Sequence, residues 1–273
     1  MSILQSFMRI FLRLFYFWEV IVLDMENRYH RNRIYINEED QRTIKEFRIL
    51  LAGAGIGSVI AECLLRFGFE NLTIIDGDKI ELSNLNRQNY TESDIGNYKT
   101  ISLQTRLLSI NKNARIKIFS EFITVENVSN FIHDFGIAIN ALDFSSNVPF
   151  LFDEICQKKN IPVIHPYNFG WAGFVTIISP TGDPMDMLGN NFMNFEFKVA
   201  AFLIDNLKKT GQQYTWIEDF INEYKAENLN LSPPQLSAGV YLLAAMVNEI
   251  IFSFVRDKKI KYFPDFYFTS LIS

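Results

Sequence analysis

A glycine-rich turn between an apolar strand and a helix constrains the fold of this chain more than any other feature. The apolar segment Arg48–Ala52 predicts a buried strand, and Gly53-Ala-Gly55-Ile-Gly57-Ser58 follows it directly. The apolar spacing over Val59–Phe67 predicts a helix, and Leu72–Ile75 predicts a second strand that ends at Asp76-Gly-Asp78. Strand, glycine turn, helix, strand and acid in this order are typical of a βαβ unit that binds a nucleotide.

The glycine turn has the chemistry of a phosphate site. Three of its residues would let the backbone approach a phosphate at the N-terminus of the following helix: Gly53, Gly55 and Gly57. Asp76 stands where an acid can hydrogen-bond a ribose. A gapless alignment with G-x-G-x-x-G places Ala52 and Ala54 where the first two glycines are customary. Alanine does not readily adopt a positive φ, so we expect a slightly altered turn.

Polar residues after the second strand indicate chemistry centred on phosphate. Ser83-Asn84-Leu-Asn-Arg87-Gln88 supplies amides and a guanidinium, and Lys99 lies twelve residues after Arg87. Arginine presents a rigid fork to phosphate oxygens, and lysine a point charge. Arg31 is a third candidate cation, upstream of the turn. Asp143 follows the apolar segment 136–142, and a carboxylate at that edge of a sheet could hold Mg²⁺ against phosphate oxygens.

The rest of the chain continues the alternation of strands and helices. Apolar spacing predicts helices over residues 100–110, 125–131, 147–158 and 235–255. It predicts strands over residues 114–119, 136–142, 162–165 and 174–178, and a strand-like tail over 261–268. We therefore expect an α/β fold: a Rossmann-like, mostly parallel sheet with helices on both faces, and a C-terminal extension of helix and strand.

Two segments differ from this pattern. Residues 1–24 are apolar but carry Arg9, Arg13 and Glu19, so they make a poor membrane span and lack the order of a signal peptide. They are either a surface or dimer-packing helix, or upstream sequence ahead of a natural start at Met25, which we favour; membrane contact is not expected. Residues 183–231, rich in Asn and Lys, should form looser helices of a crossover or substrate-facing segment within one domain, 25–273.

The composition of the chain indicates a cellular compartment and excludes one class of binding partner. A net charge of −5 and the lack of a dense Lys/Arg run argue against general nucleic-acid binding. Cys63 and Cys156 are the only cysteines, and each falls within a helical pattern. We therefore expect two buried thiols in a reducing compartment, the cytoplasm.

The candidate residues resemble, in order, the motifs of the ThiF/MoeB/ubiquitin-activating superfamily. Arg28-Tyr-His-Arg31 resembles its RYxR opening, and Gly55-Ile-Gly57-Ser58 resembles the end of its glycine turn. Ser83–Gln88 is close to its SNLxRQ signature and is the most specific match. Lys99 lies at nearly the expected distance, and Asp143 lies where the family has an aspartate associated with Mg²⁺. The resemblance extends from about residue 28 to residue 180.

The resemblance implies an enzyme that uses ATP and Mg²⁺ to adenylate the C-terminal carboxylate of a small carrier or ubiquitin-like protein, with release of pyrophosphate. It implies that Asp143 is associated with Mg²⁺ and that Arg87 and Lys99 neutralise phosphate charge. It also implies a homodimer in which Arg31 enters the partner subunit's ATP site. The nucleotide would be held by Gly53, Gly55, Gly57, Asp76, Asp78, Asn84 and Gln88.

The chain also departs from the family pattern. The paired Cys-x-x-Cys motifs that hold structural zinc in many relatives are missing, so no zinc is expected. No cysteine follows Pro180, in the region where thioester-forming relatives place their nucleophile. We therefore expect adenylation without a covalent thioester on this chain.

Other functional classes remain open. A NAD- or FAD-dependent oxidoreductase would fit the glycine turn and Asp76 but would leave the downstream cations unexplained. A noncatalytic ThiF-like module would fit the altered turn and the missing cysteine. Within the enzyme class, the relative that activates a modified tRNA adenosine also manages without zinc. His165 is either structural or on the substrate side, and the turn 169–173 is either a plain turn or part of a channel for the acceptor tail.

Overall fold

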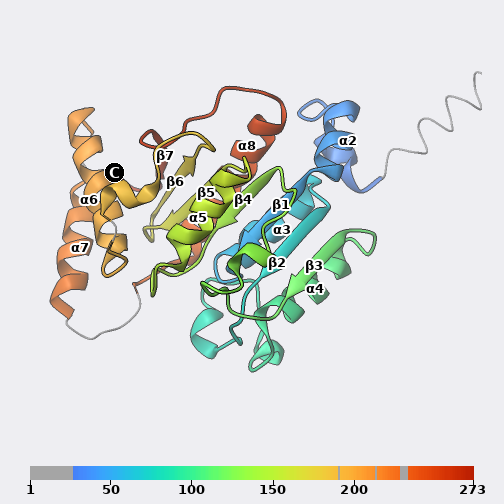
Figure 1. Cartoon of the computed structure of the whole chain (residues 1–273), viewed down its shortest axis with the longest axis horizontal. Helices are drawn as coiled ribbons and strands as arrows, with labels where there is room; N and C mark the ends of the chain where they lie inside the picture. Colours follow the sequence, from blue (N-terminus) through green and yellow to red (C-terminus); the bar gives the residue numbers. More distant parts are fainter. Residues whose placement is uncertain (1–26, 190, 213, 228–232) are drawn as a thin grey trace, which may run out of the picture.

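A single seven-stranded sheet organises the molecule, with the strand order β3-β2-β1-β4-β5-β6-β7 (Figure 1). The structure is a computed structural model that describes residues 27–273 except 190, 213 and 228–232, so the prediction for residues 1–24 lies outside the described residues. The strands are β1 Arg48–Ala52, β2 Asn71–Ile75, β3 Arg115–Phe119, β4 Ile137–Asn140, β5 Val163–Asn168, β6 Ala172–Ile178 and β7 Phe266–Ser270.

The helices alternate with the strands as expected. They are α2 Glu38–Glu46, α3 Gly57–Phe67, α4 Lys99–Ile110, α5 Val148–Lys158, α6 Phe195–Lys209, α7 Thr215–Glu227 and α8 Ser237–Val255. Short 3-10 turns are η1 Asn27–Asn32, η2 Leu82–Asn84, η3 Glu92–Asp94, η4 Val128–Asn130 and η5 Met185–Leu188. The α/β class is therefore confirmed.

The helix predicted over 125–131 is wrong, because only η4 forms there. The Asn127 side chain accepts a hydrogen bond from Thr124 N at 2.7 Å and donates to Phe122 O at 2.9 Å. A side chain that bonds to the neighbouring backbone in this way competes with helix formation.

The parallel part of the sheet places the candidate site. The strands β3, β2, β1, β4 and β5 run parallel, with β1 between β2 and β4. From β1 the chain passes through α3 to β2 on one side, whereas β4 lies on the other side. Open α/β sheets bind ligands at the carboxyl ends of the strands at such a point of divergence. The end of β1 leads into Gly53, and the end of β4 leads toward Asp143.

The C-terminal part of the sheet is antiparallel. β5 and β6 form a hairpin around residues 169–171, where Gly170 has a φ of +72°. β7 pairs with the far side of β6 and begins later than the predicted tail over 261–268. The predicted turn 169–173 therefore lies at the carboxyl end of β5, and its last two residues belong to β6.

Helices cover both faces of the sheet and enclose two apolar cores (Figure 1). One core joins α3, α4 and α8 to the sheet through residues that include Leu64, Leu103 and Val247. The other joins α5, α6 and α7 to the opposite side through residues that include Phe152, Leu203 and Ile217. Because both faces are covered, the strands can be apolar along almost their whole length, as β1 is.

The helix α8 belongs to the core of the domain. Among the described residues it is the one helix long and apolar enough to cross a membrane by length and composition. It packs against α3, β5 and β6, which accounts for its apolar character without a membrane. Tyr241, Ala245 and Glu249 follow one another at helical spacing and remain exposed.

The segment 183–231 is more regular than expected, because it contains the two well-formed helices α6 and α7. Its aromatic side chains bind it to the C-terminal part of the chain. The Phe202 ring lies 5.6 Å from that of Phe263 and 5.8 Å from that of Phe266, centroid to centroid. The ring centroids of Tyr214 and Phe268 lie 5.2 Å apart. These contacts place both helices beside the antiparallel end of the sheet (Figure 1).

Candidate functional site

The turn after β1 is built around one glycine. Gly53 has a φ of +94° and donates its amide to Ile75 O at 2.9 Å. A Cβ on Gly53 would lie 2.3 Å from Ala141 O, so no side chain fits there. Neither Ala52 nor Ala54 has a positive φ. The expected alteration of the turn is therefore not required, because glycine occupies the position that needs it.

The N-terminus of α3 follows this turn and is open to an anion. Its N-cap residue is Ile56, and no side chain caps it. Ser58 N and Val59 N donate to Gly55 O and Ile56 O, at 3.1 Å each, so among the described residues the amides left open to an anion are those of Ile56 and Gly57. Around Gly55 the nearest atom to an added Cβ is Gln88 Nε2 at 3.4 Å. Gly57 instead lets α3 pack closely on β1, with Leu51 Cδ1 only 3.1 Å from an added Cβ. Free amides at a helix N-terminus are suited to phosphate.

Asp76 fastens the turn to the end of β2. Its Oδ2 accepts from Ala54 N at 2.6 Å and its Oδ1 accepts from Asp78 N at 2.7 Å. Burial raises the pKa of Asp76, while Lys99 and the two amide bonds counteract that effect. Each carboxylate oxygen keeps a second lone pair, so Asp76 can still accept a hydrogen bond from a ribose hydroxyl.

Lys99 is a nearly buried cation among carboxylates. It is the first residue of α4, and its side chain is 9% exposed. Its Nζ lies 2.7 Å from Asp78 Oδ2, and its backbone amide donates to Asp78 O at 3.0 Å. The charge of Lys99 also acts to lower the pKa of both Asp76 and Asp143. Its ammonium group is thus within electrostatic reach of three carboxylates.

The Arg87 guanidinium is held by neutral acceptors. Its Nη1 donates to Ser83 O at 2.9 Å and to Asn86 Oδ1 at 2.8 Å. Its Nε donates to Gln235 Oε1 at 2.6 Å. Burial lowers the pKa of Arg87, whereas the nearby Asp143 acts to raise it. Arg87 and Asp143, distant in sequence, therefore face the same site.

Asn84 and Gln88 shape the loop that carries Arg87. Asn84 Oδ1 accepts from Glu81 N at 3.0 Å and so closes the turn η2. Gln88 is buried beside Gly55, and its Oε1 has no hydrogen-bond partner within the described part of the chain. A buried acceptor without a donor is costly, so Gln88 offers a ready contact to a hydroxyl or amine that enters the turn.

Asp143 lies in the connection after β4, since the strand ends at Asn140 and is shorter than the predicted 136–142. The surrounding protein raises the pKa of Asp143 by desolvation, although part of the residue is exposed to solvent. Lys99 and Arg87 act to lower that pKa, and Asp78 acts to raise it. The fold thus brings together four of the predicted site residues: Asp78, Arg87, Lys99 and Asp143.

A buried polar network supports the connection that carries Asp143. Asn140 Nδ2 donates to Asp153 Oδ1 at 2.9 Å and to Pro149 O at 3.0 Å, and Asn140 Oδ1 accepts from Leu142 N at 3.3 Å. His165 Nε2 lies 3.0 Å from Asp153 Oδ1. His165 is 1% exposed, which favours the structural alternative for this residue.

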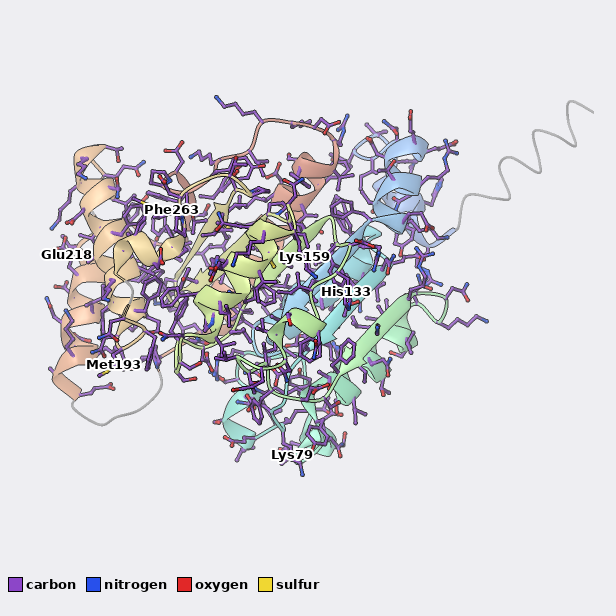
Figure 2. All side chains as sticks on the ribbon, in the orientation of Figure 1. Lys79, His133, Lys159, Met193, Glu218 and Phe263 are labelled. Carbon is purple, nitrogen blue, oxygen red and sulfur yellow. The ribbon has the colours of Figure 1, made fainter. Side chains whose placement is uncertain are left out.

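The helix α6 also approaches this edge of the sheet. Lys79, which follows β2, and Met193, which precedes α6, lie on the same lower side of the molecule in Figure 2. Glu196, in the first turn of α6, has a pKa raised by burial and by the charge of Asp143. The segment 183–231 therefore contributes a carboxylate close to Asp143.

Comparison with known proteins decides the family. A model described as the ThiF family matches residues 29–227, which is more than half of the chain. The chain belongs to the ThiF family. It is 31% identical over 166 residues to the sulfur carrier protein ThiS adenylyltransferase of Bacillus subtilis, covering 59% of this chain and 49% of that protein. It is also 31% identical over 144 residues to the tRNA threonylcarbamoyladenosine dehydratase of the same organism, covering 51% of this chain and 56% of that protein.

The ThiF-family chain spans about half the length of these curated relatives. Among solved structures, E. coli MccB with AMPCPP and MccA aligns with a TM-score of 0.66 at 18% identity. That alignment covers 90% of this chain and 71% of the MccB chain. At this level of identity the likeness shows a shared fold, including the part that follows the parallel strands.

Arg31 does not join the other site residues within this ThiF-family subunit. It is exposed in η1. The neighbouring Tyr29 donates to Leu65 O at 3.2 Å, and Asn32 donates to Phe67 O at 2.8 Å. Both acceptors lie at the C-terminal end of α3, whereas the candidate site lies at its N-terminal end. The helix α3 therefore separates Arg31 from the site of its own subunit.

Both cysteines are free thiols. Cys156 is buried, but Cys63 is only partly buried, which corrects the expectation of two buried thiols. Burial raises the pKa of each thiol. A thiol with a raised pKa is a poor nucleophile at neutral pH, and each lies in a helix of the ThiF domain rather than in the segment after Pro180.

Sequence reasoning missed Gln235, Asn140 and Glu196. Gln235 is 148 residues from Arg87, and only the position of α8 brings the two together. Asn140 could have been found as the polar residue that ends an apolar strand. No local signal distinguishes Glu196 from other helical acids. Gln235 and Glu196 depend on contacts between segments that are distant in the chain, whereas the bonds of Asn140 stay within residues 140–153.

Proposed function

We propose that this chain is an ATP- and Mg²⁺-dependent adenylyltransferase that activates the C-terminal carboxylate of a small sulfur-carrier or ubiquitin-like protein and releases pyrophosphate. The observation that carries the proposal is the gathering of Arg87, Lys99 and Asp143 at one edge of a ThiF-family sheet. The name of the similar ThiS adenylyltransferase supports the choice of acceptor.

The site has donors and acceptors that ATP requires. The uncapped N-terminus of α3 can receive phosphate oxygens, and Gly55 leaves the backbone open to them. Asp76 retains acceptor capacity for the ribose. The unpartnered Gln88 Oε1 adds a buried acceptor beside the turn. These features support ATP as the nucleotide.

Asp143 is the residue we propose to hold Mg²⁺. Its pKa is raised by desolvation and by the charge of Asp78, so the site disfavours an isolated carboxylate at this position. A bound dication would offset that cost, and carboxylate oxygens are ligands that Mg²⁺ prefers. Such an ion would neutralise charge on the phosphate oxygens.

Charge stabilisation is the main contribution of the protein to the reaction. A carboxylate oxygen of the acceptor attacks the α-phosphorus of ATP, the bond to the bridging oxygen of pyrophosphate breaks, and an acyl-adenylate remains. The nucleophile is already an anion, so no strong base is required. Arg87 and Lys99 are preorganised to stabilise the charge that develops on the phosphate oxygens. We propose that no thioester forms on this chain and that it needs no zinc.

The first test is isotope exchange between pyrophosphate and ATP in the presence of candidate carrier proteins. Arg87→Ala and Asp143→Ala should each lower exchange about a hundredfold or more, because each removes charge from the phosphate site. Arg42→Ala and Asp134→Ala, both exposed and outside the site, serve as matched controls. Full activity in either site variant would refute the site.

The exchange assay, together with measurements of nucleotide binding, separates the alternative functions. A wild-type protein that binds ATP but catalyses no exchange with any acceptor would indicate a noncatalytic module. Binding of NAD in preference to ATP would indicate an oxidoreductase. A threonylcarbamoyl-modified tRNA belongs among the acceptors tested, since a similar protein is a tRNA threonylcarbamoyladenosine dehydratase.

We further propose that the protein is a homodimer in which Arg31 completes the partner's site. Its exposure in η1 and its separation from its own site by α3 support this arrangement. The exposed residues of α8, Tyr241 and Ala245 among them, offer additional apolar surface for a two-fold contact.

Mixing variants tests the exchange of Arg31 between subunits. Inactive Arg31→Ala and inactive Arg87→Ala subunits should together regain about a quarter to a half of the activity, because some heterodimers contain one intact site. Arg33→Ala mixed with Arg87→Ala should give about half of the wild-type activity whether or not subunits exchange, so it controls for dilution with inactive subunits. If exchange of subunits is verified and activity does not return, Arg31 does not act across the interface. A monomer by light scattering would exclude the arrangement.

A further inference from the structure

The short segment 233–236, which leads into α8, is joined to the loop that carries Arg87. Gln235 Oε1 accepts from Arg87 Nε at 2.6 Å, and Gln235 O accepts from Asn86 Nδ2 at 3.2 Å. The next residue, Leu236, accepts through its carbonyl from Asn168 Nδ2 at 3.1 Å. The segment therefore connects the Arg87 loop with the β5–β6 hairpin across the edge of the sheet.

The contacts of Arg87 fix the plane of its guanidinium group. Nε and Nη1 have three acceptors between them: Gln235 Oε1, Ser83 O and Asn86 Oδ1. Within the described residues, Nη2 has no hydrogen-bond acceptor, and its two N–H groups are available to a ligand. A planar guanidinium held through Nε and Nη1 presents Nη2 in a defined direction, which lowers the entropy lost when it binds phosphate.

The acceptors around Arg87 are all uncharged, in contrast to those around Lys99. Lys99 forms an ion pair with Asp78 at 2.7 Å, so part of its charge is already balanced. Arg87 is oriented by amide and carbonyl oxygens, and the carboxylate that acts on its charge, Asp143, forms no hydrogen bond with it among the described residues. A carboxylate at position 235 could make the same bond to Nε but would neutralise the charge.

We propose that Gln235 is a positioning residue for adenylyl transfer, whose neutral amide oxygen orients the Arg87 guanidinium toward the phosphates without cancelling its charge. This inference rests on the proposed function and assigns the segment 233–236 a part in it. Leu236 is bonded to the β5–β6 hairpin and Gln235 is bonded to Arg87. A movement of the hairpin that shifts the segment 233–236 would therefore change the orientation of Arg87.

The test compares Gln235→Glu with Gln235→Ala. The glutamate variant keeps the length of the side chain and an oxygen for Arg87 Nε, so the fold and the path of the segment are preserved. Its added charge should weaken ATP binding about tenfold by calorimetry and lower pyrophosphate exchange about tenfold to a hundredfold. Gln235→Ala should also weaken ATP binding, because the guanidinium loses its orientation. Gln212→Glu makes the same charge change at an exposed, distant position and should have no effect.

Adenosine binding separates positioning from a purely structural role. Adenosine lacks phosphates, so its affinity should be the same in the wild type and in Gln235→Glu. Equal losses of ATP and adenosine affinity would show that Gln235 only holds the segment in place and would overturn the inference. ATP binding and exchange like those of the wild type would overturn it as well, while leaving the proposed function intact. A wild type that fails to bind ATP would overturn both.

Discussion

Two glycine turns at the same edge of the sheet are built in different ways. Gly53, after β1, has a φ of +94°, and an added Cβ would lie 2.3 Å from the backbone oxygen of Ala141. Gly170, after β5, has a φ of +72°, but the nearest atom to an added Cβ is Leu236 Cδ1 at 3.6 Å. Backbone meets backbone in the first turn, and a flexible side chain borders the second.

The asparagines that end the adjacent strands repeat this difference. Asn140, at the end of β4, is 4% exposed and bonds to the buried Asp153. Asn168, at the end of β5, is only partly buried and bonds to backbone groups of Gly170 and Leu236. The backbone itself therefore closes the turn after β1. The hairpin packs closely on α8, since a Cβ on Gly239 would lie 2.5 Å from Gly170 O, but the position of a Cβ on Gly170 itself is bordered only by the Leu236 side chain.

The largest difference in unfolding free energy should appear between alanine substitutions of the two glycines. Gly53→Ala combines a strained φ with a backbone collision, and we expect it to lower the free energy of unfolding by about 3 kcal/mol or more and to abolish ATP binding. Gly170→Ala has the strained φ alone and should cost about 1 kcal/mol. Urea unfolding of both variants measures the difference. Equal costs would show that the turn after β1 can relax and would remove the contrast.

A smaller difference is expected between the two asparagines. Asn140→Ala removes a donor from Asp153 in a buried network and should cost about 2 kcal/mol of unfolding free energy. Asn168→Ala should cost about 0.5 to 1 kcal/mol, because water can replace its bonds. Asn140→Ala should also raise the KM for ATP, since it releases the connection that carries Asp143. If Asn168→Ala is the more damaging of the two, the contrast between the ends of β4 and β5 does not hold.

The smallest effects concern two of the carboxylates whose pKa values burial raises, Asp143 in the connection after β4 and Glu196 on α6. A carboxyl group whose pKa is higher in the folded state destabilises the protein when it ionises. Asp143→Asn and Glu196→Gln should therefore each raise the Tm at pH 7 by about 1 to 2 °C. The gain from Asp143→Asn should disappear as the pH falls toward 3.8, the ordinary pKa of the group.

Activity distinguishes these two variants. Asp143→Asn should lose pyrophosphate exchange while becoming more stable, whereas Glu196→Gln should keep most of it. Thermal scans and exchange assays on the same preparations check both statements. A Tm for Asp143→Asn below that of the wild type would contradict the raised pKa.

The regularity of the βαβ unit made the centre of the molecule predictable. Strand, turn, helix and acid follow one another within Arg48–Asp78, and the polar contacts of Asp76 stay within this unit. The mostly parallel sheet and the helices on both faces followed from the alternation of elements. The roles of Arg87, Lys99 and Asp143 in catalysis remain predictions, although the fold brings the three residues together.

Contacts between distant segments could not be predicted in this way. The bonds from Asn86 and Arg87 to Gln235 cross 149 and 148 residues, and no periodicity records them. The helix expected over 125–131 failed for a local reason, since Asn127 bonds to its neighbours and closes a turn. Hydrophobic spacing describes which face of an element is buried, but it does not state which other element covers that face.

The anchoring of η1 has a consequence for how the protein would behave in solution. Tyr29 and Asn32 hold this turn at the C-terminal end of α3, so Arg31 stays about 15 Å of helix away from the site of its own subunit. If Arg31 serves a neighbouring molecule, turnover per chain becomes a function of concentration. Specific activity should then fall on dilution below the dissociation constant of the dimer, even with saturating ATP. The protein would be active only at concentrations high enough for the dimer to form.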